Sequence, residues 1–141
     1  IYRLKAAHPE LHVGINGGIK TLEACRAHLD AGLDSVMVGR EAYQNPWLLA
    51  EVDSQLYGRT PPASSRHDVA RAFRPYVIER LAEGARLNHV TRHLLGLFQG
   101  CTGGRRFRRH LSEHAHREGA DISVYDDAIG LVDESRLAQT A

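Results

Sequence analysis

Two short apolar stretches, each ending at or beside glycine, constrain the fold of this chain more than any other feature of its sequence. The first is residues 15–19, INGGI, and the second is residues 36–40, VMVGR. A segment with helical character follows each of them. This order is typical of buried parallel strands whose carboxyl ends lead into a helix. The sequence therefore predicts two consecutive βα units.

The turns in these two stretches are suited to binding an anion. Gly17 and Gly18 have no Cβ, so the bare backbone can approach a ligand closely. Amides at the start of a helix are unpaired and partly positive, and Arg40 adds a full charge beside Gly39. Two such turns on consecutive units are typical of the phosphate site after strands seven and eight of a (β/α)₈ barrel. Two ordinary tight turns explain the pattern about equally well, so both interpretations stay open.

The length of the chain limits how much of such a barrel it holds. A TIM barrel needs about 250 residues, whereas this chain has 141 and begins at Ile1. We therefore expect the C-terminal part of a longer protein of α/β plus all-α class. It would hold the last two βα units of a TIM (β/α)₈ barrel, followed by a small C-terminal helical bundle.

The compartment of the protein is suggested by its apolar runs and its cysteines. No apolar run approaches the length of about 20 residues that a membrane span needs, so no membrane contact is expected. Cys25 and Cys101 lie far apart in the sequence, without a CxxC motif. They are expected to be free thiols in a reducing cytosol, which favours a cytoplasmic protein.

A segment rich in glycine, proline and serine divides the chain. Residues 58–65 are the predicted linker, and residues 1–57 are the predicted barrel part. Residues 66–133 are predicted to be helical, and residues 134–141 are a polar tail without periodicity. Four apolar stripes at helical spacing predict four helices that pack as a bundle. The stripes are Val69, Phe73, Tyr76, Val77 and Leu81; Val90, Leu94, Leu97 and Phe98; Phe107, Leu111 and Ala115; and Val124, Ala128, Leu131 and Val132.

Element boundaries are predicted from apolar runs and capping residues. The two strands are expected at residues 11–15 and 33–38. Side chains that can accept a hydrogen bond from a helix amide mark the expected N-caps. These residues are Thr21, Asn45 (before Pro46), Ser65 and Ser123.

Residues 103–110, GGRRFRRH, are the densest basic segment of the chain. In a helix, Arg105, Arg108 and Arg109 share one face. Guanidinium groups bind phosphates in bidentate fashion and stack on bases, which favours an RNA partner. A solvated helix face that pairs with the acidic segment 121–134 is the other interpretation, and it stays open.

The sequence contains no recognisable catalytic constellation. The histidine pairs 89/93 and 110/114 have i, i+4 spacing, but no further ligand accompanies them, so no metal site is expected. Cys25 lies on the apolar face of its predicted helix, and Cys101 is expected to be a small packing residue. Any chemistry must therefore come from a cofactor or from residues outside this chain.

Four stretches together resemble the C-terminal portion of the tRNA-dihydrouridine synthases, and most closely their A subfamily. They are INGGI at 15–19, VMVGREAYQNPW at 36–47, HLLGLFQG at 93–100 and RRFRRHLS at 105–112. The resemblance covers nearly the whole chain, apart from the predicted linker and tail.

The resemblance implies an oxidoreductase that uses FMN and NADPH to reduce D-loop uridines of tRNA, at positions 20 and 20a, to 5,6-dihydrouridine. It implies that the FMN phosphate is held by residues of both glycine turns, and that tRNA is bound by Arg105 and Arg108. The family's catalytic cysteine lies in earlier barrel strands, so no catalytic role is assigned to a residue here. We expect a monomer without a metal, and no activity from this chain alone. The FMN-phosphate residues are Asn16, Gly17, Gly18, Gly39 and Arg40.

Two alternative functions stay open at this point. The chain could be a non-catalytic RNA-binding helical module that carries a remnant of a barrel. It could also belong to another FMN-dependent TIM-barrel oxidoreductase that acts on a small metabolite. The arginines at 105–109 argue against the small-metabolite enzyme, because such an enzyme has no need of them.

Overall fold

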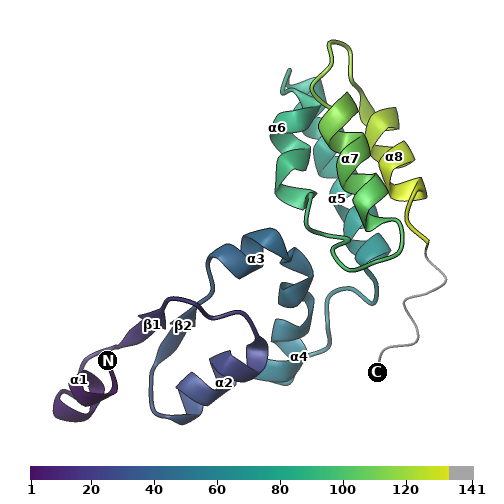
Figure 1. Cartoon of the computed structure of the whole chain (residues 1–141). Helices are drawn as coiled ribbons and strands as arrows, with labels where there is room; N and C mark the ends of the chain where they lie inside the picture. Colours follow the sequence, from purple (N-terminus) through teal and green to yellow (C-terminus); the bar gives the residue numbers. More distant parts are fainter. Residues whose placement is uncertain (134–141) are drawn as a thin grey trace. The chain divides into compact units, whose positions relative to one another are not determined.

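The computed structural model describes residues 1–133 (Figure 1). The chain forms two compact units, and the boundary between them in the sequence lies between Pro62 and Ala63. This boundary lies within residues 58–65, the predicted linker. Each unit has its own hydrophobic core. The predicted polar tail, residues 134–141, lies outside the described residues.

The first unit is built on two parallel strands, β1 (Gly14–Asn16) and β2 (Ser35–Met37). Ile15 lies opposite Val36 in the register. The helix α2 (Leu22–Asp30) connects the strands, and the short helix α1 (Tyr2–Ala7) precedes them (Figure 1). The order strand, helix, parallel strand agrees with the predicted βα units.

Both strands are shorter than predicted: β2 lies within residues 33–38, whereas β1 begins three residues after the start of the predicted range 11–15 and ends one residue beyond it. The Val13 amide donates to the Asp34 carboxylate at 2.7 Å, and the Asp34 amide donates to the Val13 carbonyl at 3.1 Å. Because the Asp34 side chain accepts the hydrogen bond of the Val13 amide, the regular pairing of the two strands begins one residue later, at Gly14.

The helix α2 begins and ends as the sequence predicts. The hydroxyl of Thr21 accepts a hydrogen bond from the Ala24 amide at 3.2 Å, so Thr21 is the N-cap. Gly32 follows the C-cap with a φ of +91°, a conformation that favours glycine. Leu22 and Cys25 point inward and form a small core with Ile19.

Three short helical segments complete the first unit: α3 (Arg40–Gln44), η1 (Pro46–Glu51) and α4 (Val52–Tyr57). Asn45 is the N-cap of η1, directly before Pro46 as predicted, but its side chain makes no capping hydrogen bond. The Asn45 amide still donates to the Glu41 carbonyl of α3 at 2.8 Å, and its carbonyl accepts from the Leu48 amide at 3.1 Å. This i to i+3 bond begins a 3₁₀ helix rather than a capped α-helix.

Within residues 63–133, the second unit contains four α-helices: α5 (Arg66–Ala82), α6 (Leu87–Thr91), α7 (Gly104–His114) and α8 (Ile122–Gly130). The hydroxyl of Ser65 accepts from the Asp68 amide at 3.0 Å and caps α5, as predicted. One continuous core lies between these helices, and each large side chain fully buried in it stabilises the unit by about 1.5–3 kcal/mol. The largest of these side chains are Tyr125, Phe98, Phe107, Leu87, Leu97 and Leu111.

Three details of the second unit differ from the sequence prediction. The stripe from Val90 to Phe98 is buried, but only α6 and the 3₁₀ turn η2 (Arg92–Leu94) are helical in it. Tyr76 is exposed, and the core aromatic is instead Tyr125, which the sequence analysis did not select. The cap of α8 is Asp121, not Ser123, because the Asp121 carboxylate accepts from the Ser123 amide at 2.9 Å. A carboxylate also suits the positive end of a helix.

Candidate functional site

The parallel pairing of β1 and β2 brings the two glycine turns together. Asn16 lies opposite Met37, and each strand ends at that residue. Gly17 and Gly18 follow β1 directly, and Gly39 follows β2 after one intervening residue. Both turns therefore leave the same edge of the sheet, which is where ligands bind in α/β folds.

A pocket of about 540 Å³ lies between the two turns, and we call it the turn pocket. All five residues that the sequence analysis assigned to a phosphate site line it. Sequence reasoning missed three further polar or charged side chains in its wall, although Lys20 stands only two residues after the glycine pair. The residues that line the turn pocket are Asn16, Gly17, Gly18, Ile19, Lys20, Met37, Gly39, Arg40, Glu41 and Gln44.

The two consecutive glycines fix the shape of the first turn. Gly17 has a φ of +128° and Gly18 a φ of +69°, and L side chains rarely adopt such values. The space around both Cα atoms is open, and a Cβ added to either residue would meet no neighbouring atom within 4 Å. The glycines are thus required for the backbone conformation, and both residues are exposed to solvent.

The charge of the turn pocket favours an anionic ligand. Arg40 is exposed and forms no ion pair with any carboxylate among residues 1–133, and Lys20 adds a second cation. Glu41 contributes one negative charge, so the cations outnumber it. Arg40 is also the first residue of α3, so its side chain reaches the pocket from the second turn, whereas the amides of Gly17 and Gly18 belong to the first turn.

A second pocket, of about 610 Å³, surrounds the start of α7 in the helical unit. We call it the arginine pocket. Arg105 and Arg108 both line it, in agreement with the prediction that they share one helix face. Arg109, which was predicted on the same face, does not line it, whereas Arg106 does. The remaining lining residues are Leu95, Phe98, Gln99, Gly100, Cys101, Gly103 and Gly104.

Gly103 and Gly104 hold the start of α7 against the core. A Cβ on Gly104 would collide with the Phe98 carbonyl oxygen, and a Cβ on Gly103 would collide with that of Leu131. Gly103 also has a φ of +91°. These contacts fix the position of the first turn of α7, and therefore the position from which its arginines project.

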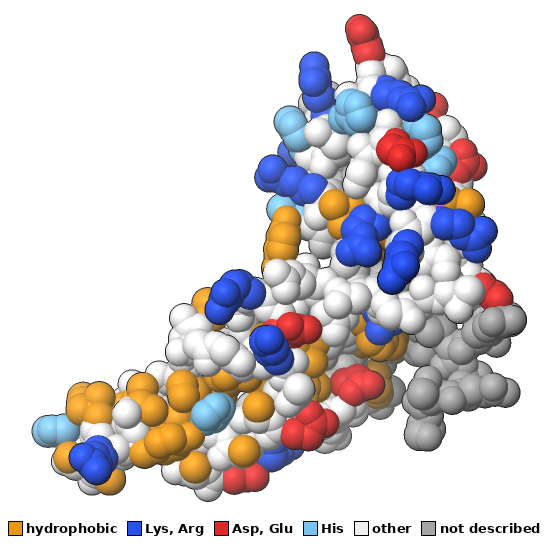
Figure 2. Space-filling model, in the orientation of Figure 1, with side chains coloured by type: hydrophobic (Ala, Val, Ile, Leu, Met, Phe, Trp, Pro, Cys, Tyr) orange, Lys and Arg blue, Asp and Glu red, His pale blue; other side chains and the backbone are white. Residues whose placement is uncertain are grey.

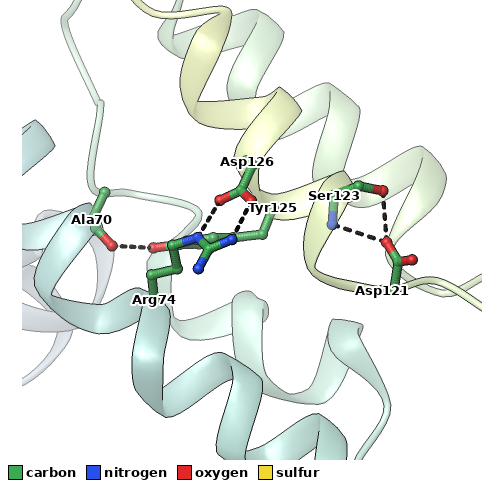
Figure 3. Close-up of polar contacts among 6 residues, drawn as sticks. All are labelled: Ala70, Arg74, Asp121, Ser123, Tyr125 and Asp126. Carbon is green, nitrogen blue, oxygen red and sulfur yellow. Dashed lines mark hydrogen bonds and ion pairs between the residues drawn. The ribbon is translucent and has the colours of Figure 1, made fainter.

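The arginines of the second unit fall into two groups. On α5, Arg71 pairs with Asp68 at 2.7 Å, and Arg74 pairs with Asp126 of α8 at 2.8 Å (Figure 3). On α7, the four arginines between Arg105 and Arg109 form no ion pair with any carboxylate among residues 1–133. Figure 2 shows Lys and Arg side chains gathered on the face of this unit that the view presents.

The pairing of basic and acidic segments that the sequence left open is not seen among the described residues. Asp126 is bound to α5, and Asp121 accepts from both the amide and the hydroxyl of Ser123, at 2.9 and 2.6 Å (Figure 3). These hydrogen bonds hold the pKa of Asp121 below its usual range. Asp121 and Asp126 are therefore engaged elsewhere and do not neutralise the α7 guanidinium groups.

Cys25 and the pair His110 and His114 line neither the turn pocket nor the arginine pocket, whereas Cys101 lines the arginine pocket. Cys25 is buried in the small core of the first unit, and burial raises the pKa of its thiol. The rings of His110 and His114 lie 4.5 Å apart, centroid to centroid. Within residues 1–133 no group of three potential metal ligands is found. Over the same range, no helix is long and apolar enough to cross a membrane.

Together these features define a class of protein: an α/β unit with a pocket between two glycine turns, joined to a helical unit with an arginine pocket. A sequence model of the family described as "Dihydrouridine synthase (Dus)" matches residues 1–132. The chain belongs to the dihydrouridine synthase family.

Proteins named "tRNA-dihydrouridine(20/20a) synthase" are similar to this chain. The protein from Escherichia coli (strain K12) is 51% identical over 136 residues, which cover 96% of this chain and 39% of the relative. The one from Shewanella oneidensis is 51% identical over 139 residues, covering 99% and 41%. The one from Vibrio cholerae is 46% identical over 136 residues, covering 96% and 41%. This chain therefore spans about two fifths of the length of these relatives.

Proposed function

We propose that this chain is part of an FMN-dependent tRNA-dihydrouridine synthase, which reduces uridines 20 and 20a in the D-loop of tRNA with NADPH. The family match and the names of the relatives support this activity. In this proposal, residues 1–57 are the last two βα units of a TIM barrel, and residues 66–133 are a tRNA-binding helical domain. The complete protein acts as a monomer.

The turn pocket is the proposed site of the FMN phosphate, and its geometry is the observation that carries the proposal. Two glycine turns from paired parallel strands converge on one pocket of about 540 Å³, and Arg40 lies at its wall. A phosphate fits this donor set, because Gly17 and Gly18 expose backbone amides and Arg40 supplies a guanidinium. The proposed phosphate residues are Asn16, Gly17, Gly18, Gly39 and Arg40.

In the proposed reaction, the residues of this chain bind the cofactor and orient it. When bound, FMN supplies the transfer of reducing equivalents from NADPH to the uracil ring. Arg40 and the two turns would hold the phosphate end of the cofactor. The proton donor is expected in the part of the protein that lies outside this chain.

The arginine pocket is the proposed tRNA contact. Arg105 and Arg108 line it together, and neither is bound to a carboxylate within residues 1–133. Guanidinium groups held in this way bind phosphate oxygens at two points and can stack on a splayed base. Their position depends on Gly103 and Gly104, which fix the first turn of α7.

The experiment that tests the proposed function is an assay of dihydrouridine in unmodified tRNA, treated with the purified full-length protein, FMN and NADPH. We expect dihydrouridine at positions 20 and 20a, detected by nucleoside mass spectrometry. Arg105→Ala and Arg108→Ala should each weaken tRNA binding and lower its salt dependence by about one unit of slope, with FMN content retained. No dihydrouridine with either NADPH or NADH would contradict the proposal.

A further inference from the structure

A third pocket lies where the turn between α5 and α6 meets the turn between α7 and α8. It has a volume of about 410 Å³ and is lined by residues 85–87 and 116–120. We call it the loop pocket. The amide of Asn88, in the first turn of α6, donates to the carbonyl of Ala115, the C-cap of α7, at 3.1 Å, so a direct hydrogen bond joins the two helices beside the pocket.

Two guanidinium groups in the loop pocket lack a carboxylate partner. Neither Arg86 nor Arg117 forms an ion pair with a carboxylate in the range 1–133, in contrast to Arg71 and Arg74 on α5. The Nε of Arg117 donates to the Glu113 carbonyl at 3.0 Å, which fixes the base of its guanidinium fork. Its terminal nitrogens keep their donors for another acceptor.

The pocket also contains a carboxylate that is not bound to these cations. Glu118 lines the loop pocket, but it forms no ion pair within the described part of the chain. The Glu118 carboxylate repels phosphate, so it would not help to bind a ligand that carries only negative charge. A ligand that offers both a phosphate and a hydroxyl donor uses all three side chains. The RNA backbone is such a ligand, because each ribose carries a 2′-hydroxyl that DNA lacks.

We infer that the loop pocket is a second RNA contact, in which Arg86 and Arg117 bind backbone phosphate and Glu118 accepts a hydrogen bond from a ribose 2′-hydroxyl. This inference rests on the proposed function, since it extends the tRNA-binding surface of the helical unit. The arginine pocket lies at the start of α7 and the loop pocket just beyond its end. The 11 residues of α7 separate the two by about 16 Å. Two cationic sites at that separation contact a nucleic-acid backbone at different phosphates.

The test compares binding of a tRNA transcript to full-length variants over a range of salt concentrations. The double variant Arg86→Ala/Arg117→Ala should bind several-fold more weakly, with a salt slope lower by about two units. Replacing both arginines by lysine keeps both positive charges, so most of the salt dependence of tRNA binding should be retained. Arg71→Ala removes the same charge from an arginine already paired with Asp68, and should leave tRNA binding nearly unchanged. Circular dichroism and thermal melting of each variant show whether it is folded.

A second arm tests the hydroxyl contact through the preference for RNA over DNA. A D-arm hairpin is prepared as RNA and as DNA of the same sequence. Glu118→Ala should reduce the ratio of RNA to DNA affinity by severalfold, while Glu113→Ala, an equal charge change in the last turn of α7, should leave the ratio unaltered. An unaltered ratio in Glu118→Ala would show that no 2′-hydroxyl is recognised there.

The outcomes separate this inference from the proposed function. If Arg105→Ala weakens tRNA binding but the loop-pocket variants bind like wild type, only this inference is wrong. If a folded wild-type protein binds no tRNA, both are wrong. Weaker binding and a lower salt slope in both sets of variants support the two contacts together.

Discussion

The hydroxyl of Tyr125 donates a hydrogen bond of 2.8 Å to the carbonyl of Ala70, and this buried contact joins α8 to α5 (Figure 3). Neither residue has measurable exposure to solvent. Burial raises the pKa of Tyr125, so its hydroxyl stays protonated and remains a donor at physiological pH. Next to it, Arg74 and Asp126 form a bidentate ion pair between the same helices.

Tyr125→Phe tests the contribution of this hydrogen bond to the stability of the helical unit. The ring stays in place, and the Ala70 carbonyl loses one partner, so unfolding should require about 1 kcal/mol less free energy. Tyr125→Ala should cost about 3–5 kcal/mol, because it also opens a cavity. Urea denaturation followed by circular dichroism measures both. Tyr76→Phe is the control, because Tyr76 is exposed; a loss equal to that of Tyr125→Phe would contradict this account.

Acid should destabilise the protein through carboxylates that are hydrogen-bonded in the native state. The pKa of Asp68 is held low by hydrogen bonds from Ser64, Arg71 and Ser65, and that of Asp121 by Ser123. A folded-state pKa below the unfolded value of about 3.9 adds stability above that pH, and this stability is lost as the pH falls through the folded-state pKa. The melting temperature should therefore drop from about pH 4 downward.

Asp121→Asn should flatten this acid dependence, because it removes one of the carboxylates whose protonation costs stability. It should also slightly lower the melting temperature at neutral pH, where the charged cap suits the start of α8. Glu79→Gln removes a charge from the exposed face of α5 and controls for net charge. An Asp121→Asn profile parallel to that of wild type between about pH 4 and pH 2 would rule out this role.

Gly104→Ala and Gly130→Ala should have opposite effects on stability, although both add one methyl group. At Gly104 the new Cβ meets the Phe98 carbonyl, so unfolding should require about 1–3 kcal/mol less, and the arginine pocket should be displaced. Gly130 lies in α8 with open space around it, so alanine should stabilise by up to about 1 kcal/mol. Thermal melts measure both, and equal shifts in the same direction would refute the packing argument.

The sequence predicts the features that depend on local chemistry. Helix caps at Thr21 and Ser65 and the burial of Phe107 and Leu111 follow from hydrogen-bonding side chains and helical periodicity. The strand ends were misplaced, because a tertiary contact from Asp34 takes the Val13 amide. No local pattern distinguishes such a contact in advance.

Local sequence patterns likewise reveal only some residues of the candidate sites. Gly17, Gly18 and Arg40 were found because glycine pairs and adjacent cations leave a signal in the chain. Lys20 was missed, since its place in the turn pocket depends on how the turn folds back. The loop pocket could not be predicted at all, because Arg86 and Arg117 are far apart in the sequence and meet only through helix packing.

The central claim is that the turn pocket holds the phosphate of a flavin, and a comparison of FMN with riboflavin tests it most directly. Riboflavin has the same ring system without the phosphate. Flavin is removed from the full-length protein, and the affinity for each compound is measured by fluorescence titration in wild type and in Arg40→Ala.

We expect wild type to bind FMN far more tightly than riboflavin. Arg40→Ala should weaken FMN binding by about 1.5–3 kcal/mol, the value of a charge-assisted contact, and leave riboflavin binding nearly unchanged. Arg3→Ala, which changes an exposed arginine on α1 outside the pocket, should affect neither. Equal losses for FMN and riboflavin in Arg40→Ala, or no loss for either, would contradict the assignment of the phosphate to this pocket.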